Sequence, residues 1–550
     1  MLAFQDFTAV TTIGDLLLHA AASHGGKDAL VFPDRRLSFD DLRAGALRFA
    51  RGMRAMGVGP GDHVGMLLPS SVETVEAFFG LALLGAVSVP INARFRAREL
   101  SYITENADLV AIVTNGRVAE DLNFIDRLNE ALPDLAHQPR NAGLSLPGCP
   151  KLKRIVLIGE DDAPGFTTGS TFARAAETVS EAEIMDLRAR VRVSDTGLIL
   201  YTSGTTSAPK GCLISHEALV RTGQSMAKRY GMTERDVFWS PLPMYHIGAM
   251  FPLCAAYSVG ATYLSMQYFE PGVAMQMIER DRATIAYPSF GTFIVDMIHH
   301  PEFEQRDLTS IRIMNSNMAM QPPSLARTIQ DKIPDIIQVG TYGMTETSGT
   351  VTTSFPSDSY ESRTGRLGRP FDGLQVEIRR PDGTPCAEDE IGEICVRGFS
   401  IFTAYYKDDA KTAEAKRDGW FHTGDLGSMD ADGTLMFHGR LKDMLKVGGE
   451  NVAAQEIETL VGGHDAVKLC QVVGRPDPRL QEVPVAFVEL KPGRSATPDE
   501  IIGFCKGKIA SFKVPRDVQF ISQWPMSASK IQKFKLKEML EERMPEATSG

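Results

Sequence analysis

The 550-residue sequence has few cysteines and no apolar stretch long enough to cross a membrane. Its seven cysteines are scattered and never form a C-x-x-C pair, which argues against a zinc site and against a disulfide framework. The longest apolar run, residues 78–91, contains two glycines and ends around Pro90, so it predicts a core helix leading into a strand. The first six residues lack the basic region of a secretory signal. We therefore expect a reduced, cytoplasmic protein with no integral membrane segment.

Basic residues are also in short supply and nowhere form a block. The chain has 58 Lys and Arg against 69 Asp and Glu, a formal net charge of −11 at pH 7. Nucleic-acid binding therefore has no electrostatic support, and any phosphate site must be local. Hydrophobic residues at 43% and charged residues at 23% are typical of globular proteins. The length exceeds what one core usually fills, so we expect at least two folding units.

Helical and strand-like segments alternate along most of the chain. Helices are expected to open at Ile13 and Asp40, and residues 132–152, which carry several Pro and Gly, predict a surface excursion. The predicted strands include residues 29–32, 64–68, 110–113, 154–158, 197–200, 283–287, 311–314 and 336–339. Such alternation predicts an α/β fold with a largely parallel sheet.

A loop rich in small hydroxyl residues and glycine, residues 201–211, follows the strand-like run 197–200. Its backbone N–H groups, hydroxyls and the single Lys210 could wrap a polyphosphate. The interval from Gly204 to Lys210 matches a Walker A loop, but Pro209 and Gly211 stand where that motif needs glycine and Ser or Thr. An ordinary surface turn remains the alternative.

A second polar segment, residues 340–347, follows the strand-like run 336–339. It offers the aromatic ring of Tyr342, which could cover a purine, and the carboxylate of Glu346, which could hold Mg²⁺. The alternative is a helix start capped by Thr345.

Other candidate residues lie further along the chain. His246 sits in apolar company, which favours a core or capping role over that of a base. Asp425 follows a glycine turn and could accept hydrogen bonds from ribose hydroxyls. After Lys442 the chain restarts a small α/β pattern, including a helix start with Thr497 as N-cap. The expected domains are therefore residues 1–441 and a smaller α+β domain, residues 442–550.

Four segments, in this order, resemble the motifs of the adenylate-forming acyl-CoA synthetase superfamily: residues 201–211, 342–347, 420–426 and 439–458. The resemblance covers essentially the whole chain. It implies a large multi-layer α/β N-terminal domain, a mobile C-terminal domain, and ATP, Mg²⁺, coenzyme A and a small-molecule carboxylic acid as ligands. It further implies that the carboxylate attacks ATP to give an acyl-adenylate and pyrophosphate, after which a thiol displaces AMP.

The resemblance also implies residue roles. Lys530 resembles the mobile lysine of the first step, Glu346 the metal ligand, and Lys442 the hinge. The implied catalytic residues are Lys210, Thr345, Glu346 and Lys530. The implied ATP contacts are Thr202, Ser203, Gly204, Thr205, Thr206, Lys210, Asn315, Ser316, Asn317, Met318, Gly340, Thr341, Tyr342, Gly343, Met344, Thr345, Asp425, Arg440 and Lys530. Gly448 and Gly449 would border the coenzyme A channel. The expected acyl pocket, inferred from apolar and aromatic character, consists of His246, Ile247, Phe251, Phe290 and Met314.

Three departures from the family pattern stand out: Ser207 replaces a glycine, Ala454 replaces a proline, and the segment before Lys530 is one residue short. If Lys530 is not the mobile lysine, Lys533 is the next candidate. One alternative function is a ligase that loads a separate carrier protein, although no carrier domain follows Gly550 in the sequence. A non-catalytic acyl-nucleotide sensor is a second alternative function, and a phosphotransferase is a third and weaker one. Whether the protein forms a homodimer is left open.

Overall fold

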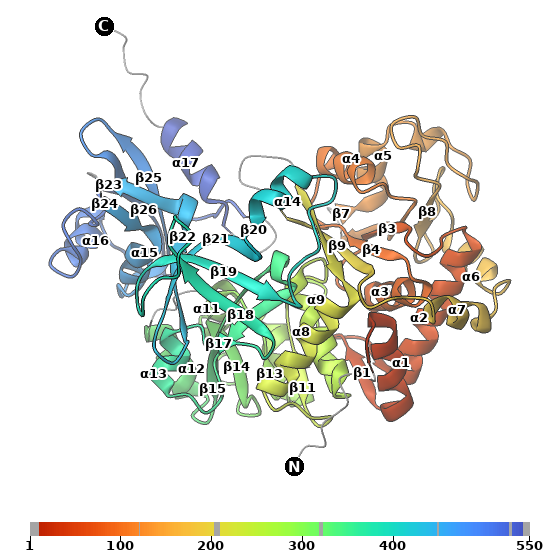
Figure 1. Ribbon diagram of the computed structural model, residues 1–550, viewed down its shortest axis with the longest axis horizontal. Helices are drawn as coiled ribbons and strands as arrows, with labels where there is room; N and C mark the ends of the chain where they lie inside the picture. The colour runs from red at the N-terminus through yellow and green to blue at the C-terminus, as the bar shows by residue number, and fades with distance from the viewer. Residues whose placement is uncertain are drawn as a thin grey trace, which may run out of the picture.

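The computed structural model describes residues 10–119, 122–202, 209–317, 323–447, 450–526 and 531–542. It shows a large N-terminal part built around three sheets and a smaller C-terminal part with a sheet of its own (Figure 1). The α/β fold class and this division are as the sequence predicts. The boundary itself, between residues 441 and 442, stays a prediction.

The largest sheet has nine strands, ordered β17-β16-β15-β14-β13-β11-β12-β1-β2. The strands from β15 to β1 pair in parallel, while β16, β17 and β2 pair antiparallel at the two edges. The strands are β1 (Asp28–Val31), β2 (Arg36–Ser38), β11 (Val237–Trp239), β12 (Thr262–Leu264), β13 (Ile285–Ala286), β14 (Ile313–Asn317), β15 (Ile337–Met344), β16 (Gly349–Thr353) and β17 (Arg369–Pro370).

A second sheet of six strands has the order β10-β9-β4-β3-β5-β8 and is parallel except between β9 and β10. Its strands are β3 (His63–Leu67), β4 (Val87–Pro90), β5 (Ala111–Thr114), β8 (Arg154–Leu157), β9 (Thr196–Thr202) and β10 (Lys210–Ser215). Strands β4 and β5 are buried at every position, as continuous apolar runs in a parallel sheet require. A short hairpin, β6 (Arg117–Ala119) and β7 (Leu122–Asn123), lies apart from it.

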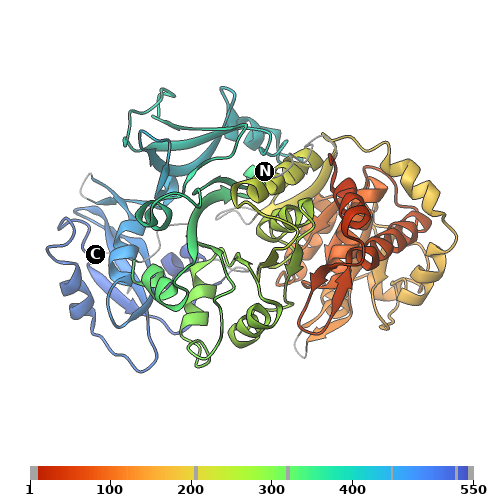
Figure 2. The ribbon, with the colours of Figure 1, turned by 90° about the horizontal axis from the view of Figure 1, so that it is seen from below.

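Helices fill the space between these two sheets, because one core cluster contains apolar residues of both sheets and of several helices, the five longest of the molecule among them (Figure 2). The five are α1 (Ile13–His24), α2 (Phe39–Ala55), α3 (Val72–Leu84), α8 (His216–Arg229) and α9 (Ile247–Ser258). The other helices of this part are α4 (Ala97–Asn106), α5 (Phe124–Ala131), α6 (Gly169–Ala176), α7 (Glu181–Arg188), α10 (Pro271–Asp281), α11 (Gly291–Ile298), α12 (Pro323–Lys332), α13 (Tyr360–Gly365) and α14 (Asp409–Ala415).

A third, wholly antiparallel sheet joins the N-terminal part to the rest of the chain, and the sequence analysis did not predict it. Its order is β18-β19-β21-β20, with β22 paired to β21. The strands are β18 (Leu374–Arg379), β19 (Gly392–Gly398), β20 (Lys416–Arg417), β21 (Trp420–Met429) and β22 (Leu435–Arg440).

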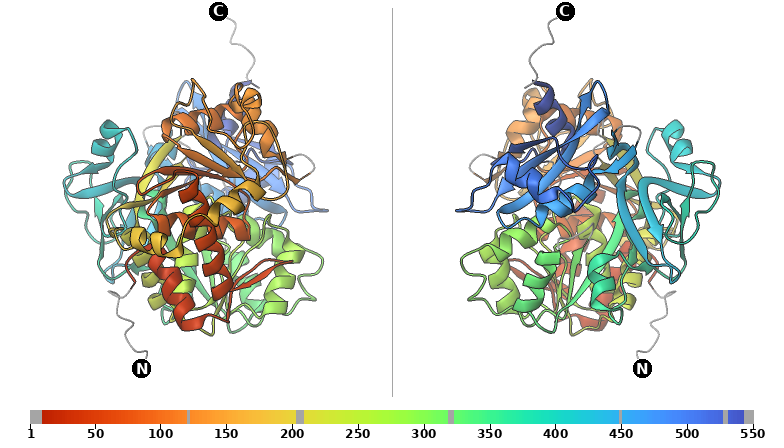
Figure 3. Two further views of the ribbon diagram at one scale, coloured as in Figure 1. Left: turned by 90° about the vertical axis from the view of Figure 1, so that its right-hand side faces the viewer. Right: turned by 90° about the vertical axis from the view of Figure 1, so that its left-hand side faces the viewer.

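The C-terminal part builds a five-stranded sheet over its own apolar clusters (Figure 3). Its strands are β23 (Met444–Val447), β24 (Glu450–Ala453), β25 (Val467–Asp477), β26 (Gln481–Leu490) and β27 (Asp517–Phe520), and its helices are α15 (Ala454–Gly462), α16 (Pro498–Cys505) and α17 (Lys533–Glu542). Helix α16 starts as predicted, with Thr497 as N-cap and Glu500 closing a capping box.

Two sequence-based expectations need correction. The predicted strand 336–339 continues to Met344, because residues 341–344 pair with β16. The predicted surface excursion, residues 132–152, buries Leu135 and Leu152 in an apolar cluster, so it is packed onto the second sheet's core. No helix among the described residues is long and apolar enough to span a membrane, and all seven cysteines are free thiols.

Candidate active site

The proposed phosphate loop is a strand-to-strand connection. Thr202 ends β9, Lys210 begins β10, and the two residues are direct partners in the antiparallel register. In a Walker A motif the lysine opens a helix, so this geometry rules out that alternative. Residues 203–208, which include Ser203, Gly204, Thr205 and Thr206, lie outside the described residues.

Tyr405 links the carboxylate of Glu346 to Lys210. Glu346 is in the 3₁₀ turn Thr345–Thr347 that follows β15, and it is only 9% exposed. The Tyr405 hydroxyl donates to Glu346 Oε1 at 3.0 Å, and Lys210 Nζ lies 5.1 Å from the centre of the same ring. Burial and the neighbouring carboxylate raise the pKa of Tyr405 far above its usual range, so the hydroxyl stays a donor. The sequence analysis missed Tyr405.

These residues suit a hard cation such as Mg²⁺. A buried carboxylate offers oxygen ligands, and Mg²⁺ takes few protein ligands beside phosphate oxygens. The thiol of Cys212 is fully buried close by, and burial together with the charge of Glu346 raises its pKa well above the usual value. The thiol is therefore neutral and does not compete as a soft metal ligand. Glu346 fits the role of metal ligand.

Three predicted nucleotide contacts meet where the first and third sheets adjoin. The Tyr342 hydroxyl donates to Asp425 Oδ2 at 2.9 Å, and Arg440 Nε lies 3.3 Å from Asp425 Oδ1. Asp425 and Arg440 are direct partners in the pairing of β21 with β22. The Tyr342 ring is 6.3 Å from that of Phe437, and burial raises the pKa of Tyr342 well above its usual range. The structure thus brings together an aromatic wall, a carboxylate and a guanidinium from distant parts of the sequence.

Asn315, Ser316 and Asn317, which were expected to form part of a turn beside the adenine, are instead the last three residues of β14, which pairs with β15. Asn315 is fully buried and donates from Nδ2 to Thr341 Oγ1 at 2.6 Å, and Ser316 is buried beside it. A Cβ atom at Gly340 would lie 2.0 Å from the carbonyl oxygen of Arg366, so only glycine fits there. Asn317 ends the strand, and Met318 lies outside the described residues.

The same close packing surrounds the end of β15. A Cβ atom at Gly343 would lie 2.0 Å from the carbonyl oxygen of Gly349, which holds β15 against β16. Met344, the last residue of β15, and Thr345 are both half-buried. Thr345 does not cap a helix: the turn's N-cap position is Met344.

A hydrogen-bonded cluster of Glu393, Cys395 and His422 supports the backbone directly before Asp425. Glu393 Oε1 accepts from the backbone N–H of Gly424 at 3.0 Å, and Oε2 lies 2.8 Å from His422 Nδ1. Cys395 Sγ approaches the same Nδ1 at 3.4 Å. The three ligand atoms lie within 4.8 Å of one another, but Arg417 is 3.4 Å from Glu393 Oε2 and burial raises the pKa of Cys395 to about 12. His422 Nδ1 contacts both Glu393 and Cys395, and the cationic Arg417 already lies beside Glu393. The cluster is therefore better suited to positioning the segment before Asp425 than to binding a metal ion.

The predicted acyl-pocket residues are spread over two apolar clusters. His246 occupies the N-cap position of α9 with its ring 4.8 Å from that of Tyr245, and Ile247 is the first residue of that helix. Phe251, one turn later, is buried against Gly349, where a Cβ atom would lie 2.4 Å from its ring.

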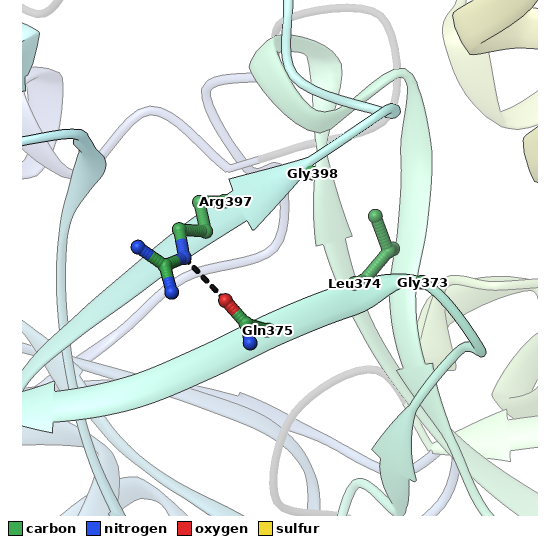
Figure 4. A pocket seen from close by; sticks show the side chains of 5 residues that line it. All are labelled: Gly373, Leu374, Gln375, Arg397 and Gly398. Carbon is green, nitrogen blue, oxygen red and sulfur yellow. Dashed lines mark hydrogen bonds between the residues drawn. The ribbon is translucent and has the colours of Figure 1, made fainter.

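The remaining two pocket candidates differ: Phe290 packs against the same apolar cluster as Ile247 and Phe251, whereas Met314 belongs to a second cluster. Met314 lines an enclosed apolar space of about 20 Å³, room for little more than one water. Phe290 precedes α11 and packs on Phe293 at 6.1 Å. A larger open hollow of about 470 Å³ lies on β18 and β19 (Figure 4), and none of the predicted site residues lines it.

The two lysine candidates for the mobile role differ in placement. Lys530, like Gly448 and Gly449, lies outside the described residues. Lys533 donates to Glu458 Oε1 at 2.6 Å, and that carboxylate is buried and also holds the backbone N–H of Val472. Breaking such a buried pair is costly, which leaves Lys530 as the prediction. Lys442 lies in the 3₁₀ turn Leu441–Asp443 between β22 and β23.

Comparison with known proteins covers both parts of the chain. Residues 17–406 match the model of the AMP-binding enzyme family, and residues 456–530 match that of the AMP-binding enzyme C-terminal domain. The protein YngI of Bacillus subtilis (strain 168) is 34% identical over 536 residues, covering 96% of this chain and 97% of YngI. The mitochondrial medium-chain acyl-CoA ligase ACSF2 of Rattus norvegicus is 31% identical over 544 residues, covering 97% and 88%.

Among solved structures, the anthranilate CoA ligase AuaEII in complex with anthranoyl-AMP superposes with a TM-score of 0.86 at 27% identity, covering 98% of this chain and 99% of AuaEII. Both the N-terminal and the C-terminal family models, and relatives over nearly the full length, agree with the motifs and the geometry. The chain therefore belongs to the AMP-binding enzyme family and is an AMP-forming acyl-CoA synthetase of the adenylate-forming superfamily.

Proposed function

We propose that the protein activates a hydrophobic carboxylic acid with Mg-ATP in two steps. In the first, a carboxylate oxygen bonds to the α-phosphorus of ATP and the bond to pyrophosphate breaks. In the second, the thiol sulfur of coenzyme A bonds to the acyl carbon, the bond to AMP breaks and the thiol proton is released. The observation that carries this proposal is that Tyr405 links Lys210 to Glu346, directly after β15, while Tyr342 on β15 contacts Asp425, which pairs with Arg440 across β21 and β22.

The residues suit the first step because it builds negative charge on phosphate oxygens. Such a reaction needs cations and N–H donors already in place, and no protein nucleophile. Lys210 would meet the β- and γ-phosphates, while Tyr342 and Asp425 would hold the adenosine. Mg²⁺, held by Glu346, would neutralise charge on the triphosphate. Lys530 would bridge the carboxylate and the phosphate.

The acid is proposed to be hydrophobic, of medium chain length or containing a ring. The apolar residues around Ile247, Phe251 and Phe290 support this class. So do the names of two similar proteins, a medium-chain acyl-CoA ligase and an anthranilate CoA ligase. The acceptor is proposed to be free coenzyme A, with a separate carrier protein as the alternative, and the cytoplasmic location remains a proposal.

The proposal is tested with the purified protein, Mg-ATP and a panel of straight-chain and aromatic acids. We expect acid-dependent pyrophosphate release, AMP as the nucleotide product, and an acyl-CoA product only when coenzyme A is present. Formation of ADP would contradict the reaction. Pyrophosphate release without any acyl-CoA would favour the carrier-protein alternative, and no release with any acid would favour the sensor.

A further inference from the structure

Residues 402–406 connect β10, the strand that Lys210 opens, with the turn that carries Glu346. Along β10, the backbone N–H of Leu213 donates to Ala404 at 2.9 Å, Thr403 donates to Leu213 at 2.7 Å, and Tyr406 donates to Gly211 at 2.7 Å. Cys212 and Tyr405 thereby form an antiparallel bridge. The segment is fixed to the strand that Lys210 opens.

The same segment also holds Glu346 at two points. The backbone N–H of Phe402 donates to the carbonyl oxygen of Glu346 at 2.8 Å, and the Tyr405 hydroxyl donates to its carboxylate at 3.0 Å. Tyr405 itself is fixed, because its backbone N–H donates to Thr412 Oγ1 at 3.0 Å and its ring packs 4.6 Å from that of Phe402. Tyr405 is 7% exposed and Glu346 9%, so water does not replace this bond readily.

We propose that Tyr405 is a positioning residue for the metal carboxylate: its hydroxyl holds Glu346 in the orientation that binds the divalent cation accompanying ATP. The inference rests on the proposed function. A free glutamate side chain rotates about three bonds, and fixing it beforehand removes an entropy cost that would otherwise weaken binding. Partners that orient metal ligands commonly change metal affinity by about 10- to 100-fold.

The same ring adds a second link. Lys210 Nζ lies over its face at 5.1 Å, within the range in which an ammonium is attracted to an aromatic ring. Phenylalanine keeps that face and removes only the hydroxyl. Tyr405→Phe therefore separates the hydrogen bond to Glu346 from the packing under Lys210.

The test uses the full-length protein and Mn²⁺ as the probe. Its affinity is measured by electron paramagnetic resonance in the presence of the α,β-methylene analogue of ATP, which cannot release pyrophosphate. We expect Tyr405→Phe to weaken Mn²⁺ binding about tenfold, and to raise the Mg²⁺ concentration for half-maximal pyrophosphate release by a similar factor. The matched control is Tyr406→Phe, which removes a hydroxyl that bonds to Asp108 at 2.8 Å and should leave Mn²⁺ binding unchanged.

A double-mutant cycle tests whether Tyr405 affects metal binding through Glu346. In a Glu346→Ala background, Tyr405→Phe should have no further effect on Mn²⁺ binding, because the side-chain oxygens that it positions are gone. Equal losses in both backgrounds, or wild-type Mn²⁺ affinity in a folded Tyr405→Phe protein, would overturn the inference while leaving the proposed function intact. If the wild-type protein binds no Mn²⁺ with the analogue, the proposed metal site itself is wrong.

Discussion

At the scale of single residues, His246 illustrates a side chain whose position limits its chemistry. It occupies the N-cap position of α9, with its ring 4.8 Å from that of Tyr245 and with Ile247 next to it in the chain. We expect His246→Ala to change which acids are accepted far more than it changes the KM for ATP. The measurement is kcat/KM across the acid panel. A uniform loss for every acid, with a pH profile shifted by one ionisation, would instead identify a base.

Asp108 shows how one carboxylate can tie distant segments together. Lys407 and Lys151 lie 2.9 and 3.0 Å from its oxygens, and Tyr406 donates to it. These partners outweigh the effect of burial and lower the pKa of Asp108 to about 2. A lowered pKa means that the stabilisation is present above the unfolded value and is lost as the pH falls through the folded one.

Asp108→Asn should therefore lower the melting temperature at pH 7 by about 2 °C. Asparagine tolerates the positive φ of 52° at this position, so the change removes charge and adds little strain. The difference from wild type should shrink as the pH falls from about 4 towards 2, measured by differential scanning fluorimetry. A difference that stays constant over this range would show that the charge is not responsible.

Residue types near a motif were predictable from the sequence, but their partners were not. Lys210, Glu346 and Asp425 lie in the phosphate loop, in the 342–347 segment and after the glycine turn, all of which the sequence had indicated. No motif in the sequence pointed to Tyr405. It contacts Glu346 across 59 positions of sequence, and no spacing or periodicity connects the two.

At the scale of elements, β21 carries Asp425, the proposed ribose contact, directly after a glycine turn that neighbouring residues hold in place. Gly424 has φ +70°, Thr423 donates to the carbonyl oxygen of Ile394 at 2.8 Å, and Glu393 holds the N–H of Gly424. These bonds fix the backbone directly before Asp425. Glutamine at position 393 can accept with only one of its two terminal atoms, so it cannot keep both the Gly424 and His422 contacts as they are.

Glu393→Gln should raise the KM for ATP about tenfold, the cost of one hydrogen bond to a charged group, with a smaller change in kcat. The control is Glu377→Gln on β18, which removes a charge from the same sheet where it pairs with Arg379. Steady-state kinetics with ATP as the varied substrate provides the measurement. A loss of kcat with an unchanged KM would contradict a positioning role.

Long apolar strands were easier to predict than short amphipathic ones. The buried runs of the two parallel sheets were visible as uninterrupted apolar segments. Residues 374–379 instead alternate between buried and more exposed positions, and such a short pattern in polar surroundings is easily taken for a loop. The extension of β15 to Met344 was hidden because its glycines resemble a turn, whereas they allow close packing against neighbouring backbone.

At the scale of the whole molecule, the sequence predicted two parts but not how they meet. Separate apolar clusters form within the C-terminal part, so its core does not determine its docking. One contact between the parts is ionic: Lys468 Nζ on β25 lies 3.4 Å from Asp296 Oδ1 on α11, and 3.0 Å from Glu489 of its own domain. Helix α11 starts directly after Phe290, a predicted acyl-pocket residue.

The ion pair between Lys468 and Asp296 offers a way to test the proposed rotation of the C-terminal domain. The two half-reactions are proposed to need different groups at the same centre. Lys530 would serve adenylation, and the channel beside Gly448 and Gly449 would serve thioester formation. A rotation of the C-terminal domain near Lys442 would replace the first group by the second. Lys530→Ala should therefore abolish acid-dependent pyrophosphate release while largely sparing the conversion of supplied acyl-AMP to acyl-CoA. A single static site would instead lose both half-reactions together.

Asp296→Lys should disturb the docking itself. The carboxylate is 44% exposed, so the pair contributes under about 1 kcal/mol, but a lysine there adds repulsion towards Lys468. If the arrangement seen here belongs to one half-reaction, the ratio of the two half-reaction rates should change by about threefold or more, measured separately as pyrophosphate release and as acyl-AMP conversion. Asp331→Lys, on the neighbouring α12, makes the same charge change at an exposed site and should leave the ratio unaltered. Equal changes in the rates of both half-reactions for Asp296→Lys would mean that the Asp296–Lys468 contact does not differ between the two arrangements of the C-terminal domain. The position of the pivot would then have to be established from other contacts.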